Sequence, residues 1–211
     1  MKTLLLLMGT ILFALAGNSQ PNNPYNKRGA DFQTSLKIIQ TDYYAGKVKE
    51  INEETIAKYQ KVLPIQLQMN LPLANQVINT YKSPKTNYGN LVEKTKLSGF
   101  GKELMNVIVN PQNLDEGSFK RMLEKKVDEL KTLKIDTNEK EFLFTVAAIG
   151  YNMPMGREPI RQCFIEGIYG NTPVPCWVSG AVQGAIIGYE SCGVLCAIGG
   201  AIVGALSGWF S

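Results

Sequence analysis

The chain has 211 residues and a formal net charge of +4, with 22 Lys and Arg residues against 18 Asp and Glu residues. So small and scattered an excess of positive charge does not indicate a nucleic-acid-binding protein. The chain has no histidine, which excludes a His general base, Ser-His and Cys-His nucleophile pairs, and His-containing zinc sites.

The first residues predict export. Lys2 precedes an apolar run of about a dozen residues, which ends in the small-x-small sequence ALA at 14–16. Such a run is too short to span a bilayer comfortably. We therefore expect a signal peptide at 1–16 and a mature protein that is secreted or stays in the periplasm or cell envelope.

The middle of the chain predicts a mainly α fold. Residues 17–30 are rich in Asn, Pro and Gly without apolar periodicity, which is typical of a flexible lead-in. Between 31 and 155 apolar residues recur at helical spacing, most clearly at 118–134. A second clear helix begins at Asp136, which forms with Glu139 a pattern that resembles a capping box. We expect these two helices to pack as an antiparallel pair inside a helical globular domain.

Residues 65–71 alternate apolar and polar side chains with period two, which favours a strand. The Val-Ile-Val sequence at 107–109 is the plausible partner, so the sequence leaves room for one minor β-hairpin. The alternative is an irregular helix ended by Pro72. Residues 83–101 contain several helix-breaking residues and are expected to form mostly loop.

The last segment, 177–211, is apolar, and Glu190 is its single charged residue. Glycine recurs at every fourth residue in two sets, which places each set along one side of an α-helix. Glycine lowers helix propensity by about 1 kcal/mol relative to alanine in water, and the close approach of a second helix offsets this cost, most effectively in a bilayer. We expect a glycine-zipper hairpin of two helices, at about 178–189 and 193–210, with its turn at Glu190. The residues expected to engage a membrane or a second copy are Gly180, Gly184, Gly188, Gly200, Gly204, Gly208 and Trp209.

All four cysteines lie in the last quarter of the chain. An even number of cysteines in an exported protein indicates disulfides. Three connectivities are possible. We favour Cys163 with Cys176, which would close the Pro-rich linker at 156–176, and Cys192 with Cys196, which lie one helical turn apart.

The tail resembles the membrane-permeabilising part of bacteriocins, particularly the two-peptide class with GxxxG helices, in its GAIIG and GGAIVGALSG sequences and its terminal aromatic residue. The YGN sequence at 169–171 before Cys176 is similar to the opening of pediocin-like bacteriocins, although Thr and Pro at 172–173 replace the usual Gly and Val. The tail is equally similar to glycine-zipper segments of bacterial envelope proteins. These resemblances imply insertion into a membrane or self-association.

We therefore expect an exported bacterial protein whose C-terminal hairpin inserts into a membrane or binds another copy of itself. We expect no catalytic residues, metal, cofactor or small-molecule substrate, because no sequence motif for such a site is present. The alternative is a soluble periplasmic or secreted interaction module whose tail is buried in its own core. A third alternative is an enzyme that uses carboxylates or lysines, whose acidic residues here lie within amphipathic, Lys-rich stretches.

Overall fold

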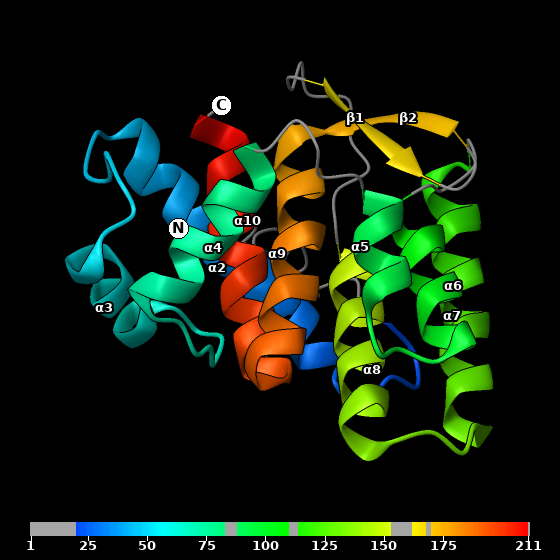
Figure 1. Ribbon diagram of the computed structural model, residues 1–211. Coiled ribbons are helices and arrows are strands. Elements are labelled where there is room, and N and C mark those ends of the chain that lie inside the picture. The colour runs from blue at the N-terminus through cyan, green and yellow to red at the C-terminus, as the bar shows by residue number, and fades with distance from the viewer. Residues whose placement is uncertain (1–19, 83–87, 110–113, 153–161, 168–169, 211) are drawn as a thin grey trace, which may run out of the picture.

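The fold is mainly α and ends in a helical hairpin, as predicted (Figure 1). The computed structural model describes residues 20–82, 88–109, 114–152, 162–167 and 170–210, and of residues 109, 162–167, 170–175 and 209–210 it describes the backbone alone. The expected signal peptide at 1–16 lies outside these ranges. The elements, labelled as in Figure 1, are α2 (Asn26–Tyr44), α3 (Glu53–Val62), α4 (Leu71–Lys82), α5 (Tyr88–Lys94), α6 (Gly99–Val109), α7 (Glu116–Thr132), α8 (Thr137–Asn152), β1 (Gln162–Gly167), β2 (Gly170–Pro175), α9 (Cys176–Cys192) and α10 (Val194–Phe210).

Polar side chains cap the starts of several helices. Asn52 Oδ1 accepts a hydrogen bond from Thr55 N at 2.9 Å, at the start of α3. At the start of α7, Asp115 Oδ1 accepts one from Ser118 N at 2.9 Å. Asp136 Oδ1 caps α8 in the same way. These caps satisfy backbone N–H groups that have no partner inside their own helix.

Glu139 departs from the predicted capping box. In such a box its carboxylate would accept a hydrogen bond from the backbone N–H of Asp136. Instead Glu139 Oε1 accepts one from Ser98 N at 2.7 Å, just before α6. The Glu139 side chain therefore joins the start of α8 to the start of α6, and it is buried there.

Ordered structure replaces most of the flexible lead-in expected at 17–30. Helix α2 begins inside this range, and the buried Asn23 donates a hydrogen bond through Nδ2 to Phe144 O at 2.9 Å. Gly29 lies directly on the backbone of Ala148, where a Cβ would not fit. Helix α2 packs on α8 through this close approach, which an apolar periodicity does not reveal.

The predicted strand at 65–71 is wrong, because residues 65–70 form no ladder and 107–109 belong to α6. The segment lies along α10 instead, where Gln68 N donates a hydrogen bond to Leu195 O at 3.0 Å. The period-two pattern arises because one side of this extended segment is buried, and the buried side faces a helix and not a second strand. The alternative is also wrong, since Pro72 lies in the first turn of α4, where proline is tolerated.

Two further segments contain more regular structure than a loop or a linker. The loop expected at 83–101 contains α5 and the start of α6. The linker expected at 156–176 contains an antiparallel β-hairpin, with Gln162 opposite Pro175 and Gly167 opposite Gly170. The other parts of these two segments, apart from residues 95–98, are outside the described residues or belong to the first turn of α9.

Helices α9 and α10 form the predicted C-terminal hairpin, here called the glycine hairpin (176–210). The turn falls at Gly193, three residues after Glu190. Gly193 has φ +85°, a left-handed conformation that glycine adopts without strain. Its N–H donates a hydrogen bond to Tyr189 O at 2.9 Å and so closes the last turn of α9.

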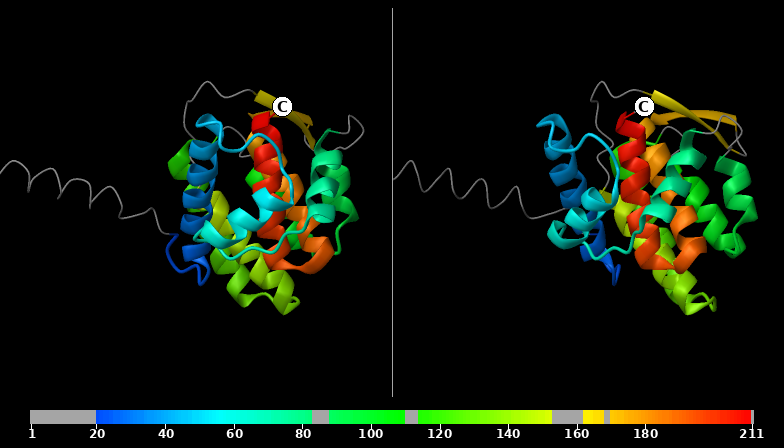
Figure 2. Two further views of the ribbon diagram at one scale, coloured as in Figure 1. Left: turned by 90° about the vertical axis from the view of Figure 1, so that its left-hand side faces the viewer. Right: turned by 60° about the vertical axis from the view of Figure 1, so that its left-hand side comes forward.

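The glycine hairpin lies in the middle of the fold, with helices on both sides (Figures 1 and 2). Helix α4 packs against both α9 and α10, and α5, α6 and α8 also contact the hairpin. One hydrophobic cluster includes Phe32 of α2, Leu143 of α8 and Ile198 of α10. The helical region expected at 31–155 and the hairpin expected at 177–211 therefore share one core. Residues 20–152 are called the sheath below.

Candidate functional site: the glycine hairpin

Six glycines line the contact between α9 and α10. At each of them the backbone of one helix touches the backbone of the other, so the two helix axes approach closely. From the open end of the hairpin to its turn, the contacts are Gly208 with Cys176, Gly204 with Gly180, Gly200 with Gly184, and Cys196 with Gly188.

No side chain fits between the helices at these positions. A Cβ added to any of the six glycines would collide with a carbonyl oxygen of the opposite helix. A carbonyl oxygen directed at a glycine Cα is the arrangement of Cα–H···O contacts between helices, worth about 0.5–1 kcal/mol each. These contacts and the accompanying dispersion attraction offset the helix-propensity cost of glycine, about 1 kcal/mol per residue.

The six glycines are therefore occupied within the chain. The sequence assigns them to a membrane or to a second copy, but in this fold each row is covered by the other helix of the same hairpin. Trp209 lies in α10, with only its backbone described.

Apolar side chains of the sheath cover the outer faces of the glycine hairpin. Phe142 of α8 stacks on Tyr189 of α9, with ring centroids 4.1 Å apart. Trp177 of α9 is 5 % exposed. On the side of α4, Val77 clusters with Ile187. The hairpin is thus enclosed by side chains from several helices.

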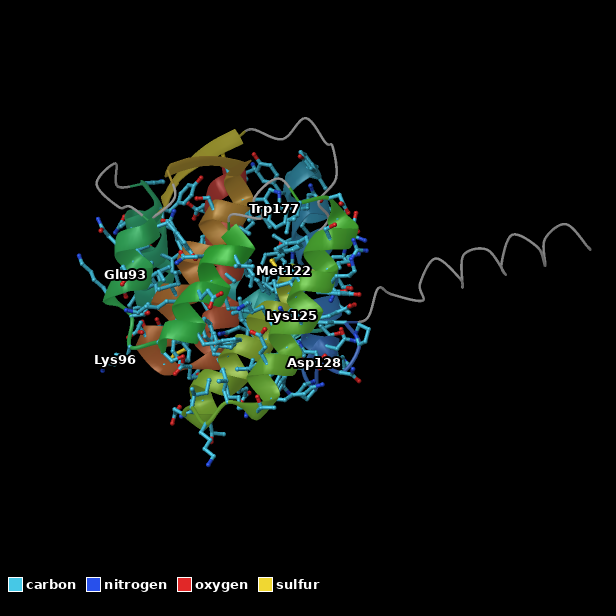
Figure 3. All side chains as sticks on the ribbon, turned by 90° about the vertical axis from the view of Figure 1, so that its right-hand side faces the viewer. Glu93, Lys96, Met122, Lys125, Asp128 and Trp177 are labelled. Carbon is cyan, nitrogen blue, oxygen red and sulfur yellow. A yellow bond between two sulfur atoms is a disulfide. The ribbon has the colours of Figure 1, made fainter. Side chains whose placement is uncertain are left out.

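The outer surface of the sheath is charged, in contrast to the hairpin. Helix α7 buries Leu123 and Val127 and exposes Lys125 and Asp128, which Figure 3 labels on its outward face. This distribution is that of an amphipathic helix with its apolar stripe toward the core.

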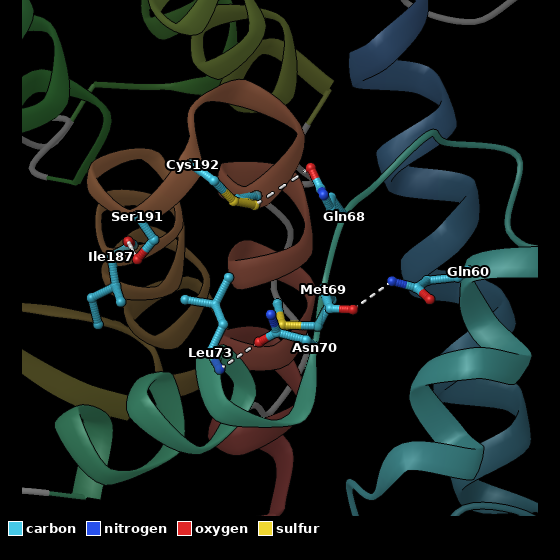
Figure 4. Close-up of a disulfide and its surroundings, with 9 residues drawn as sticks. Gln60, Gln68, Met69, Asn70, Leu73, Ile187, Ser191 and Cys192 are labelled. Carbon is cyan, nitrogen blue, oxygen red and sulfur yellow. Dashed lines mark hydrogen bonds between the residues drawn. A yellow bond between two sulfur atoms is a disulfide. The ribbon is translucent and has the colours of Figure 1, made fainter.

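A seventh glycine, Gly199, contacts the sheath. It lies against the backbone oxygen of Gln68, in the extended segment that covers α10. Figure 4 shows this segment beside α10, held on its other side by a hydrogen bond from Gln60 Nε2 to Met69 O at 2.6 Å. Sequence reasoning missed this role of Gly199. The Gly-Gly pair at 199–200 is the signal that could have revealed it, because only the second glycine falls in the four-residue row.

The Cys192–Cys196 disulfide is present, as predicted, and spans the turn of the glycine hairpin (Figure 4). The two Cα atoms are 5.6 Å apart. Cys176 is also disulfide-bonded. The side chain of Cys163 is outside the described part of the chain, so the pairing of Cys163 with Cys176 stays a prediction.

Polar contacts between hairpin and sheath are concentrated near the two ends of the hairpin. Near the turn, Lys96 N donates a hydrogen bond to Glu190 Oε1 at 3.1 Å. At the open end, Tyr81 Oη donates one to Cys176 O at 3.5 Å. Burial raises the pKa of Tyr189 to about 12, and the nearby carboxylates add to this rise. The partly buried Tyr189 hydroxyl thus stays protonated to a higher pH than a tyrosine in water does.

An open hollow of about 520 Å³ lies at the turn of the glycine hairpin, partly lined by Asp136, Glu141 and Glu190. Each of these acids has a structural partner: Asp136 caps α8, and Glu141 Oε1 lies 2.7 Å from Arg28 Nη1. Within the described ranges, no three His, Cys, Asp or Glu residues gather as metal ligands.

Comparisons with protein-family models, with curated proteins and with solved structures find no match for this chain. No helix in the described ranges has both the length and the apolarity needed to cross a bilayer. Helix α10 has 17 residues, which corresponds to about 26 Å at about 1.5 Å per residue.

Proposed function

We propose that this is an exported bacterial protein that stores a membrane-active glycine hairpin inside its sheath and acts by transferring the hairpin to a bilayer. The observation that supports this most is the row of backbone contacts between α9 and α10. Because each helix fills the glycine groove of the other, the hairpin's internal packing does not depend on the sheath. The hairpin can therefore leave as a preformed unit, in the manner of a glycine zipper.

A bilayer can replace the sheath as the environment of the hairpin. The covering contacts are mainly apolar, such as Phe142 on Tyr189 and Val77 near Ile187, and lipid chains supply an equally apolar surface. Backbone N–H and C=O groups in the middle of the two helices are bonded within the helices, as lipid requires. Glu190, the single charge of the hairpin, lies near the turn, where it can remain in a polar layer.

The sheath has a suitable role after the hairpin leaves. Its helices present apolar stripes, such as that containing Leu123 and Val127 in α7, and charged outer faces. Amphipathic helices of this kind bind at the surface of a bilayer. The apolar surface that the sheath exposes when the hairpin leaves is thereby covered again by the bilayer.

Tryptophan fluorescence tests the transfer directly, because both tryptophans of the chain, Trp177 and Trp209, lie in the glycine hairpin. The mature chain, with its disulfides intact, is mixed with phosphatidylcholine and phosphatidylglycerol vesicles whose acyl chains carry bromine. We expect quenching of the tryptophan fluorescence together with release of a trapped dye. Unquenched fluorescence at a large excess of lipid would overturn the proposal.

Two matched variants separate insertion from surface binding. Leu195 in the hairpin and Val62 in the sheath are both partly exposed, at 38 % and 54 %, so glutamate at either site leaves the sheathed fold intact. Leu195→Glu adds a second charge beside Glu190 at the turn, which raises the cost of carrying the turn into or across the bilayer, and we expect insertion on the order of tenfold weaker. Val62→Glu makes the same change of charge outside the hairpin and should insert like the wild type.

A second candidate function is a soluble interaction module, favoured by the hydrophobic clusters that the hairpin shares with the sheath. In that case the hairpin is a structural element, and the partner binds the charged surface of the sheath. Unquenched tryptophans, no dye release and a protease-resistant monomer in the presence of vesicles are the results that this candidate predicts.

A further inference from the structure

Helix α9 carries a polar face that is distinct from its glycine row. Ser179, Gln183 and Glu190 are spaced by four and seven residues, which places them on one side of the helix. Gly180 and Gly184 each come one residue after a residue of this polar face, and Gly188 comes two residues before Glu190. One residue corresponds to a rotation of about 100° around the helix axis. The glycine side packs on α10, so the polar side is directed away from that contact.

The side-chain amide of Gln183 is only half satisfied in the sheathed fold. Gln183 is 8 % exposed and Ser179 is 3 % exposed. Gln183 Nε2 donates a hydrogen bond to Ser179 Oγ at 3.2 Å. Gln183 Oε1 is buried without a hydrogen-bond partner in the described part of the protein. A buried carbonyl without a partner is unfavourable, so stability of the sheathed fold alone does not explain a glutamine here.

We propose that Gln183, with Ser179, is the contact through which the glycine hairpins of two copies of this chain bind each other in the bilayer. This inference rests on the proposed function. In lipid there is no water to bond the Gln183 amide, and a second copy related by a two-fold axis supplies the same amide. Each Nε2 then donates to the Oε1 of the other copy, which gives two reciprocal hydrogen bonds between the inserted helices.

The glycine rows cannot serve as this contact while the hairpin stays closed. Each row already touches the opposite helix of its own chain, which leaves the polar face as the specific surface that release uncovers. The sheath covers Ser179 and Gln183 before release. The association therefore follows insertion, and the protein in buffer stays monomeric.

Three variants of the full mature chain test the contact. Gln183→Leu removes the amide at similar volume, Gln183→Asn keeps an amide on a shorter side chain, and Ile187→Leu is a volume-conserving control on the same helix. Gln183→Leu also removes the unpartnered acceptor, so its Tm in buffer should equal or exceed that of the wild type. Insertion is measured by quenching with brominated lipid, and association by amine-reactive crosslinking of vesicle-bound protein followed by denaturing electrophoresis.

We expect Gln183→Leu to insert like the wild type but to lose at least four fifths of the crosslinked dimer, a drop of about fivefold that corresponds to about 1 kcal/mol. Gln183→Asn should recover part of the dimer, and Ile187→Leu should behave as the wild type. Undiminished crosslinking of an inserted Gln183→Leu variant overturns this inference and leaves the proposed function standing. If brominated lipid does not quench the tryptophans of the wild-type chain, the proposed function is overturned instead.

Discussion

Replacing Gly204 by alanine is expected to destabilise the fold, although alanine is the better helix former. A Cβ at this position would lie 1.9 Å from Gly180 O. To restore an ordinary van der Waals distance of 3.4 Å, the two helices must separate locally by about 1.5 Å. The obstacle is a backbone carbonyl inside a helix, which cannot rotate away as the end of a side chain can.

The expected magnitude follows from two opposing terms. Overpacking a well-packed contact costs about 1–3 kcal/mol, and we take the upper end, about 3 kcal/mol, because the clash here is with backbone. Alanine recovers about 1 kcal/mol of helix propensity. The free energy of unfolding should therefore fall by about 2 kcal/mol, which lowers Tm by about 4–8 °C for a protein of this size.

Gly150→Ala is the matched control, because it makes the same change in the interior of another helix. Around Gly150 the nearest atoms to an added Cβ are side-chain atoms of Ile108 and Leu123 at 3.5 Å, which is ordinary contact. This variant should be more stable than the wild type, by up to about 1 kcal/mol. Thermal unfolding by circular dichroism measures both variants. A Gly204→Ala protein that melts at or above the wild-type Tm would refute the assignment of backbone contact between α9 and α10.

Three further predictions concern the sheath and the turn. Gly199→Ala should push the 65–70 segment off α10 without touching the glycine row, so Tm falls while dye release from vesicles becomes faster; slower release would contradict the storage role of the sheath. The hydrogen bond from Lys58 lowers the pKa of Asp42, so the ionised Asp42 stabilises the folded state. This stabilisation is present above the pKa that Asp42 has in the unfolded chain, and it is lost as pH falls through the lower pKa that Asp42 has in the fold. Asp42→Asn should therefore lower Tm at pH 7, and thermal melts should show its difference from the wild type shrinking below about pH 4. In the double variant Cys192→Ala and Cys196→Ala the free energy of unfolding should fall by about 2 kcal/mol, which is the value for a disulfide that closes a loop of about five residues. Urea unfolding measures this change, and a wild-type free energy of unfolding would contradict a stabilising role for this bridge.

The glycine hairpin could be predicted from sequence because its determinants are local. Glycines at four-residue spacing, the absence of charge and the polar residues around Glu190 together define two helices and a turn. The Cys192–Cys196 bridge follows from the same helix geometry. The cap at Asp136 could be predicted for the same reason, because a cap depends on residues within one turn.

Other features depend on contacts between distant segments and left weaker traces in the sequence. The pattern at 65–70 correctly marks a buried side, but which element covers that side depends on α10, more than one hundred positions away. Gly29 looks like a loop residue until Ala148 is placed against it. The question of what covers the glycine rows is of the same kind, since a membrane, a second copy and the opposite helix all fit the same spacing.

The central claim is that the glycine hairpin moves from sheath to bilayer as an intact unit. Amide hydrogen exchange of the mature chain, with and without vesicles, tests it most directly. We predict that peptides from 176–210 stay protected in both conditions, whereas peptides from 53–82 and 116–152 lose protection when vesicles are present. Unchanged protection of the sheath in the presence of vesicles, or hairpin peptides that exchange as fast as those of the sheath, would contradict the claim.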